Sequence, residues 1–107
     1  MNDPLVSIII SVFEQLAYTK KCLSALKHTL SDKLSYEILI VDDSSQDGTV
    51  EFLKKLEYPC RCFFNNEKKG FAKNNNLAAN NAKGEYLCFV NNDVFVEGNW
   101  LLPMVEV

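Results

Sequence analysis

Two adjacent aspartates, Asp42 and Asp43, follow the apolar run Tyr36–Val41 and precede the turn-forming residues 44–48. Neighbouring carboxylates directly after a buried strand cost free energy unless water solvates them or a bound group donates hydrogen bonds to them. A nucleobase edge and a ribose carry such N–H and O–H donors. The pair is therefore a candidate for binding a nucleotide. An ordinary capped turn, in which Asp and Ser are common, is the alternative.

A second polar cluster, Asn91, Asn92 and Asp93, follows the apolar run Glu85–Val90. Its carboxylate and amide oxygens suit Mg²⁺ or Mn²⁺, with Asp93 as the candidate metal ligand and the two asparagines as candidate substrate-binding residues. One carboxylate is a weak metal site, so we expect the site to form together with a diphosphate. The metal would then stabilise charge on a leaving phosphate. A plain turn is the alternative for this triplet.

The segment Gly70–Leu77 combines a glycine, a lysine and a run of amides at the expected start of a helix. Helix N-termini favour anions because their first N–H groups lack partners within the helix. Gly70 and Lys73 are therefore candidate phosphate-binding residues, together with Lys69. A solvated helix surface is the alternative for the lysines. The common glycine-rich motifs of NTPases and dinucleotide-binding folds are absent from the sequence.

Apolar runs and helical periodicities alternate along the chain and predict the elements that position these clusters. Strands are expected over 5–12, 36–41, 60–64 and 85–90, and helices over 16–30, 49–57 and 71–82. The first strand is almost continuously apolar, which is typical of a central strand covered on both faces. Asp47 or Thr49 is expected to cap the second helix, and Gly84 to end the third.

This order of elements predicts an α/β fold, with a mostly parallel sheet, helices on its faces and right-handed crossovers. Open sheets of this kind bind ligands beyond the carboxyl ends of their strands, near the point where the strand order reverses. That edge would gather residues 11–14, 42–47 and 91–93. We therefore expect one pocket to use all three segments.

Composition and charge limit the class of protein. The chain has 107 residues, enough for one domain over residues 1–107, and 48% of them are hydrophobic, as in a packed globular protein. A net charge of -3 gives no general attraction for nucleic acid, so no nucleic-acid partner is expected. The four cysteines are expected to be reduced thiols. No signal peptide or membrane span is recognised, which predicts a cytoplasmic location.

Taken in order, the segments 6–13, 41–49, 70–77, 84–86 and 91–93 resemble family-two glycosyltransferases. The Gly-Phe-Ala and Asn-Asn-Asp forms are most similar to the branch with bacterial rhamnosyl and related polysaccharide transferases. The resemblance implies a GT-A fold, which is a Rossmann-like three-layer α/β/α arrangement, here truncated. It also implies metal-assisted, inverting transfer of a sugar from a UDP- or dTDP-linked donor to a hydroxyl of a glycan or lipid-linked acceptor.

The resemblance also implies roles for residues at the expected pocket. Ser11 and Phe13 would border the nucleobase, with Phe13 stacking on it where the family often has tyrosine. Asp42 or Asp43 would hold the base and ribose. Ser11 replaces the usual proline and Phe13-Glu14 replaces the frequent Tyr-Asn pair. Because Glu14 occupies the position of that asparagine, it is also a candidate substrate-binding residue.

For the metal and the chemistry, the resemblance again assigns positions. Asp93 matches the last acidic position of the family's Asp-x-Asp motif and would bind the metal, whereas Asn91 stands where the first aspartate often lies. The general base is expected beyond residue 107, so no catalytic residue is assigned and this chain alone is predicted to be inactive. Apolar residues in the segment Trp100–Val107 predict a possible homodimer, and the full-length enzyme is expected to associate with membranes.

Two other functions remain open from the sequence. The first is a nucleotide-binding module that does not catalyse a reaction. The second is a nucleotidyltransferase-like domain, a class that usually has a glycine-rich, basic first loop. The loop Ser11–Gln15 contains neither glycine nor a basic residue, which disfavours the second alternative.

Overall fold

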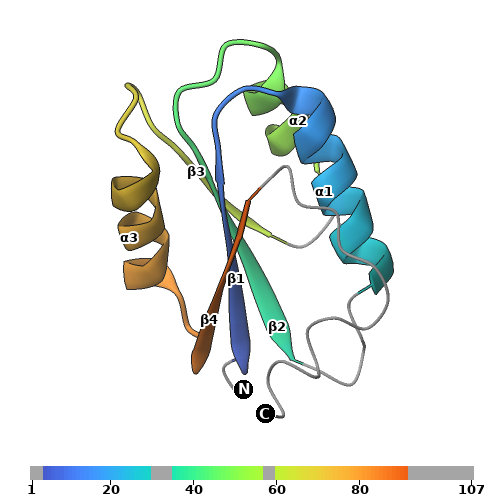
Figure 1. Ribbon diagram of the computed structural model, residues 1–107, viewed down its shortest axis with the longest axis vertical. Helices are drawn as coiled ribbons and strands as arrows, with labels where there is room; N and C mark the ends of the chain where they lie inside the picture. The colour runs from blue at the N-terminus through green and yellow to red at the C-terminus, as the bar shows by residue number, and fades with distance from the viewer. Residues whose placement is uncertain (1–3, 30–34, 57–59, 92–107) are drawn as a thin grey trace.

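The computed structural model describes residues 4–29, 35–56 and 60–91. These residues form four strands and three helices that alternate along the chain (Figure 1). In chain order they are β1 (Val6–Val12), α1 (Leu16–Thr29), β2 (Tyr36–Asp42), α2 (Thr49–Lys54), β3 (Arg61–Phe64), α3 (Phe71–Asn81) and β4 (Tyr86–Asn91). The predicted alternation is confirmed, although α2 ends at Lys54 rather than at residue 57.

The strands form one parallel sheet in the order β3-β2-β1-β4. β1 therefore lies between β2 and β4, as its apolar sequence predicted. The chain moves outward from β1 to β3 and then returns, so that β4 pairs with the other side of β1. This reversal of strand order is the place where open parallel sheets bind ligands.

Helices cover both faces of this sheet, with α1 and α2 on one side and α3 on the other (Figure 1). Ile8 and Ile10 of β1 pack with Leu26 in the core on the α1 side, whereas Ile9 belongs to the smaller core that contains Ala78 of α3. All five side chains are at most 1% exposed. Burial of a side chain the size of Ile contributes roughly 1.5–3 kcal/mol, so β1 anchors both layers.

The start of α2 differs from the expected cap. Its N-cap is Gly48, with φ 96° and no side-chain cap hydrogen bond, instead of Asp47 or Thr49. Asp47 accepts hydrogen bonds from Thr49 Oγ1 (2.5 Å), from Thr49 N (3.2 Å) and from Leu16 N (3.1 Å). The bond from the Thr49 hydroxyl is the main cause that holds the pKa of Asp47 below its ordinary value. Asp47 thus joins the start of α2 to the start of α1.

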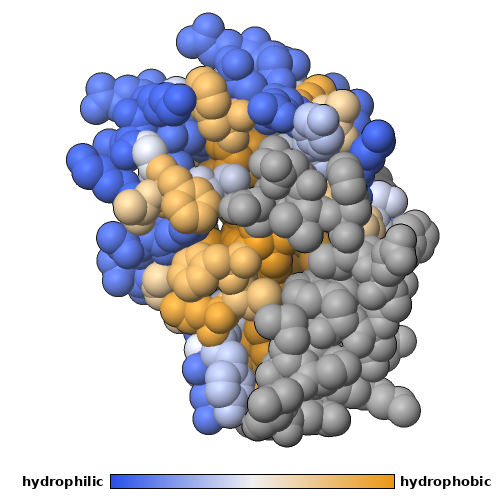
Figure 2. Space-filling model, viewed as in Figure 1, coloured by the Kyte–Doolittle hydropathy of each residue, from blue (hydrophilic) through white to orange (hydrophobic). Residues whose placement is uncertain are grey.

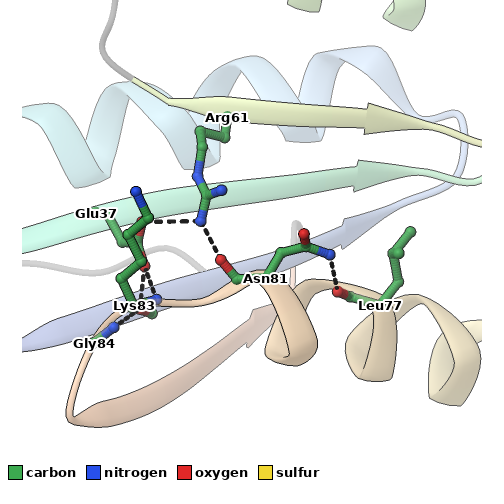
Figure 3. Close-up of polar contacts among 7 residues, drawn as sticks. Glu37, Arg61, Leu77, Asn81, Lys83 and Gly84 are labelled. Carbon is green, nitrogen blue, oxygen red and sulfur yellow. Dashed lines mark hydrogen bonds and ion pairs between the residues drawn. The ribbon is translucent and has the colours of Figure 1, made fainter.

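A polar cluster around Glu37 holds the amino-terminal edge of the sheet together (Figure 3). Glu37 Oε2 accepts hydrogen bonds from Ser7 Oγ (2.5 Å) and Lys83 N (2.6 Å), and Oε1 accepts one from Arg61 Nη2 (3.2 Å). Burial opposes ionisation of Glu37, but the bonds from Ser7, Lys83 and Arg61 outweigh it and lower its pKa. Glu37 therefore connects β1, β2 and β3 to the α3–β4 connection.

Gly84 does not end α3, contrary to the expectation from sequence. The helix ends at Asn81, and its C-cap, Ala82, is already extended. Gly84 instead lies against β1, where Gly84 N donates to Ser7 Oγ (2.7 Å). A Cβ atom at this position would lie 2.5 Å from Ser7 N. The glycine is required because the two backbones approach too closely for a side chain.

Three large apolar side chains of β4 are about half exposed, namely Tyr86, Leu87 and Phe89. β4 is the end strand of the sheet in the described part of the chain. The apolar surface at the centre of Figure 2 lies where Figure 1 has β4. Within the described ranges, no helix has the length and apolar character needed to cross a membrane.

The close approach at Gly84 predicts a strong effect of a single methyl group. We expect Gly84→Ala to lower the free energy of unfolding by about 2–3 kcal/mol, because the backbone of β1 must move to accommodate the Cβ atom. Urea denaturation followed by circular dichroism measures this. Lys83→Ala is the matched control: its side chain is exposed and only its backbone binds Glu37, so a change within about 0.5 kcal/mol is expected. Equal stability of the two variants would contradict the steric argument.

Candidate functional site

The carboxyl ends of β1, β2 and β4 lie side by side, as the parallel topology predicted. Ser11 is level with Val41 of β2 and with Asn91 of β4, and Val12 is level with Asp42. Residues from three distant parts of the sequence therefore meet at one edge of the sheet. This edge is the candidate functional site.

Asp43 is a buried carboxylate of this edge that accepts several hydrogen bonds. It is 2% exposed. Its Oδ1 accepts from Lys69 N (2.7 Å) and Asn65 Nδ2 (3.1 Å), and its Oδ2 accepts from Gly70 N (3.0 Å). Burial alone would raise the pKa of Asp43. These hydrogen bonds and one from the Asn74 side chain lower it by a larger amount, so the net shift of the pKa is downward. Asp43 is therefore a fixed negative charge.

Asp42 has a different environment, although it is the adjacent residue. It is 1% exposed, and its Oδ2 accepts a hydrogen bond from Ser45 N (3.0 Å). Its Oδ1 is buried and has no hydrogen-bond partner among the described residues. An unpaired buried carboxylate oxygen is costly, typically about 1–3 kcal/mol or more. Asp42 thus supports the turn after β2, while one of its oxygens is left to be satisfied by something else.

The loop after β1 is held in an unusual backbone conformation. Glu14 has φ 55° and Gln15 has φ 56°, values in the left-handed region that non-glycine residues rarely adopt, and Ser44 in the facing loop after β2 has φ 63°. Glu14 N donates to Ser45 Oγ (2.6 Å), and Leu16 N donates to Asp47 Oδ2 (3.1 Å). The hydroxyl and the carboxylate hold the loop after β1 against the loop after β2. These two hydrogen bonds fix the position of Phe13, the aromatic residue that precedes Glu14.

Phe13 presents its ring at this edge and is 39% exposed. Lys68 Nζ lies 3.9 Å from the centroid of the ring. A cation over an aromatic face at an exposed site contributes about 0.5–1 kcal/mol. Lys68, which comes from the loop between β3 and α3, therefore covers the ring predicted to stack on a nucleobase.

The segment that enters α3 already binds an anion, the carboxylate of Asp43. The backbone N–H groups of Lys69 and Gly70, directly before the first residue of α3, both donate to Asp43. Gly70 has φ 92°, which suits a glycine. Lys73 is exposed on α3. The phosphate-binding role of Gly70 and Lys73 stays a prediction, because the backbone donors of this loop are occupied by a carboxylate of the protein itself.

A chain of amides connects Asp43 to β1. Asn65 Nδ2 donates both to Asp43 Oδ1 and to Asn74 Oδ1 (2.7 Å), and Asn74 Nδ2 donates to Ser11 Oγ (3.1 Å). Asn74 is 2% exposed. We call the residues Ser11, Asn74, Asn65 and Asp43 the amide relay. It joins β1, β2, the β3–α3 loop and α3.

The candidate metal ligand lies outside the described residues. Asn91 is the last residue of β4 and is level with Ser11, but Asn92, Asp93 and the segment Trp100–Val107 are not among the described residues. In the described part of the chain, no group of three or more His, Cys, Asp or Glu side chains is arranged to hold a metal ion. The roles of these residues in metal, substrate and dimer contacts therefore stay predictions.

Comparison with known proteins agrees with this geometry. Residues 7–107 match the model of glycosyl transferase family 2. The chain belongs to this family. Glycosyltransferase AglE of Haloferax volcanii is 31% identical over 101 residues, which are 92% of this chain and 33% of the relative. The poly(ribitol-phosphate) beta-glucosyltransferase of Bacillus spizizenii is 33% identical over 101 residues, 91% of this chain and 16% of the relative.

Solved structures of glycosyltransferases have the same fold. S. aureus TarS 1-349 in complex with UDP-GlcNAc superimposes with a TM-score of 0.83 at 24% identity, over 95% of this chain and 30% of TarS. The Pyrobaculum calidifontis mannosyltransferase PcManGT, in complex with GDP-Man and Mn²⁺, gives a TM-score of 0.79 at 20% identity, over 92% and 30%. The predicted GT-A fold of this family 2 chain is confirmed. The chain spans about a third of the length of AglE and of these structures.

Several contacts of this family 2 site are not visible in the sequence. Asn65, Lys68 and Ser45 were not assigned roles, and Asn74 was one of a run of three similar asparagines. The sequence predicts Lys69 and Gly70 as phosphate-binding residues, but it does not predict that their backbone N–H groups bind Asp43. A signal that was available is the number of short polar residues in the loop, since a buried carboxylate requires donors nearby. The similarity to the rhamnosyltransferase branch stays a prediction.

The bonds to Asp43 predict how stability depends on pH. A carboxylate with a lowered folded pKa stabilises the fold fully above its unfolded pKa of about 4, and this contribution is lost as the pH falls through the folded pKa. We expect Asp43→Asn to cost about 1–3 kcal/mol at pH 7, because an amide NH₂ group then faces an N–H donor. The variant should also lose less stability than the wild type between pH 5 and pH 3.

Urea denaturation at a series of pH values measures both effects. Asp42→Asn is the matched control, because the amide oxygen keeps the bond to Ser45 N and the NH₂ group replaces the unpaired oxygen. We expect it to change the free energy of unfolding at pH 7 by less than about 1 kcal/mol. A larger loss for Asp42→Asn than for Asp43→Asn would refute the assignment of Asp43 as the main structural carboxylate.

Proposed function

We propose that this chain forms the donor site of a glycosyltransferase, which transfers a sugar from a nucleoside diphosphate to an acceptor hydroxyl. Membership of glycosyl transferase family 2 and the convergence of three polar segments at the carboxyl edge of the sheet support this function. TarS binds UDP-GlcNAc and UDP, and PcManGT binds GDP-Man, on the same fold. The donor is therefore a nucleoside-diphosphate sugar.

Asp43 is the observation that carries the proposal. The carboxylate is held in place by three backbone or amide donors, and its lowered pKa keeps it ionised at neutral pH. Its Oδ2 accepts one backbone hydrogen bond, from Gly70 N, and is the oxygen that would accept a hydrogen bond from a ligand. Uracil, thymine and guanine present a ring N–H to such an acceptor, whereas the corresponding ring nitrogen of cytosine has no hydrogen. A UDP- or dTDP-linked donor fits this edge.

Phe13 and the metal complete the proposed donor site. The half-exposed ring of Phe13 offers a stacking surface once Lys68 moves off it. The Mn²⁺ in PcManGT supports a divalent metal, Mg²⁺ or Mn²⁺, held by Asp93 and the donor diphosphate. When bound, this metal would neutralise charge on the departing diphosphate. Asn91 and Asn92, beside Asp93 in the sequence, would contact the same end of the donor.

The remaining parts of the reaction are proposals for the whole enzyme. The acceptor, a glycan or a lipid-linked sugar, and the general base would be bound by residues beyond position 107. General base catalysis typically contributes about 10²–10⁴-fold, so this chain by itself would bind the donor with negligible turnover. A cytoplasmic location, with membrane association of the whole enzyme, is part of the same proposal. A binding module without catalysis is the competing function.

Calorimetric titration of the chain with nucleoside diphosphates tests the donor site. We expect UDP and dTDP to bind at least about tenfold more tightly than CDP, because cytosine lacks the ring N–H and places an acceptor against Asp43. Addition of Mn²⁺ should strengthen binding, and Asp93→Asn should abolish that increase. Absence of binding by all three nucleotides would refute the proposed function, and turnover by the isolated chain would refute the assignment of the general base.

Replacement of Phe13 tests the stacking surface. We expect Phe13→Ala to weaken UDP binding about tenfold or more, since stacking of a base on an aromatic ring is worth about 1–3 kcal/mol. Tyr86→Ala is the matched control, because Tyr86 is similarly exposed but lies at the amino end of β4, the opposite edge of the sheet. It should leave the affinity unchanged. Equal losses in both variants would exclude a specific role of Phe13.

A further inference from the structure

Asn74 is a buried amide without an assigned role. It lies in the first turn of α3 and is 2% exposed, beside two asparagines that are more exposed. A buried amide that lacks partners is costly, and Asn74 avoids this cost because its oxygen and its nitrogen are both used. Its hydrogen-bond partners are Asn65 and Ser11, one on each side, and its side chain also contributes to lowering the pKa of Asp43. Asn74 therefore connects the loop after β3 with the end of β1.

The hydrogen bonds of the amide relay all donate in one direction along the chain of side chains, and the carboxylate of Asp43 determines that direction. An ionised carboxylate only accepts hydrogen bonds, so Asn65 must turn its Nδ2 toward Asp43. The other Nδ2 hydrogen of Asn65 then goes to Asn74 Oδ1. This leaves Asn74 Nδ2 to donate to Ser11 Oγ. A reversed amide at either position would bring two acceptors or two donors face to face.

The direction determines what the relay offers to a ligand. Ser11 Oγ accepts from Asn74, so its own hydroxyl hydrogen is left over, and it makes no hydrogen bond to the described residues. Asn65 Oδ1 likewise accepts no hydrogen bond from the described part of the chain, because both of its contacts use Nδ2. The amide relay therefore presents one donor, Ser11, and two acceptors, Asn65 and Asp43, to a ligand. Ser11 is half-buried, and so is Asn65, which leaves both within reach of a ligand.

We propose that Asn74 is a positioning residue that fixes Ser11 as a hydrogen-bond donor and Asn65 as an acceptor, and that this polarity selects a base with a ring N–H beside a carbonyl. The inference rests on the proposed function and deepens it. Uracil and thymine carry this arrangement, as does guanine, whereas cytosine has an acceptor at the corresponding ring nitrogen. Asn74 acts through its two neighbours and does not contact the base.

The ratio of UDP to CDP affinity tests this proposal. Asn74→Leu has a similar shape but neither donates nor accepts, so both Ser11 and the Asn65 amide become free to reorient. We expect UDP affinity to fall about tenfold while CDP affinity changes less than about threefold, which shrinks the ratio. A general loosening of the fold would lower both affinities. The matched control is Asn80→Ala, an exposed asparagine of the same helix, which should leave the ratio unchanged.

Asn65→Ala removes the relay at its other amide and should shrink the ratio to the same extent. The double variant Asn65→Ala/Asn74→Leu should shrink it no further, because both changes interrupt one chain of bonds. An unchanged ratio in Asn74→Leu, or losses that multiply in the double variant, would overturn the proposal. If Asn74→Leu does not fold, Asn74→Ala with Asn65→Ala completes the same cycle.

A measurement without nucleotide separates the relay from the proposed function. In a ¹H–¹⁵N spectrum, the two side-chain NH₂ signals of Asn65 should be shifted and protected from exchange in the wild type, since both hydrogens are bonded. Asn74→Leu should move them toward the values of a solvent-exposed amide. If they do not move, the relay is refuted even when nucleotides bind. If they move but UDP does not bind to the wild type, the relay stands and the proposed function fails.

Discussion

The carboxylate of Asp43 is the interaction on which the candidate site depends. It lies at the end of β2 and accepts hydrogen bonds from the backbone of the β3–α3 loop and from an amide of the same loop. A charge buried to this extent is tolerated only when donors surround it. Because these donors come from a segment more than twenty residues away, the charge determines where that loop lies. Phe13, Ser11 and the start of α3 are then arranged around one fixed anion.

The fold could be predicted from the sequence because its central strand, β1, is almost continuously apolar. A segment such as Ile8–Ile10 has no polar face, and the pattern therefore required cover on both sides, which α1 and α3 provide. Parallel order then followed from the intervening helices, and with it the meeting of Ser11, Asp42 and Asn91 at one edge. The position of the candidate site could thus be predicted before any contact was known.

The contacts within the site could not be predicted in the same way. Asn74 and its neighbours are identical in type, and only the packing of α3 on the sheet decides which one is buried. The two aspartates are likewise of the same type, yet they have different partners, because Asp42 is the last residue of β2 and Asp43 begins the loop that follows it. Gly84 was interpreted as a helix stop, since the approach of its backbone to Ser7 depends on tertiary packing.

The carboxylates at the two ends of β2 have a joint mechanical consequence. Glu37 binds the backbone that leaves α3, and Asp43 binds the backbone that enters it. On the opposite side of the site, the loops after β1 and β2 are joined by the Ser45 hydroxyl, which accepts from Glu14 N, and by the Asp47 carboxylate, which accepts from Leu16 N. Both ends of α3 are themselves hydrogen-bonded to carboxylates at the two ends of one strand, which fixes the position of the helix relative to the sheet and restricts its movement.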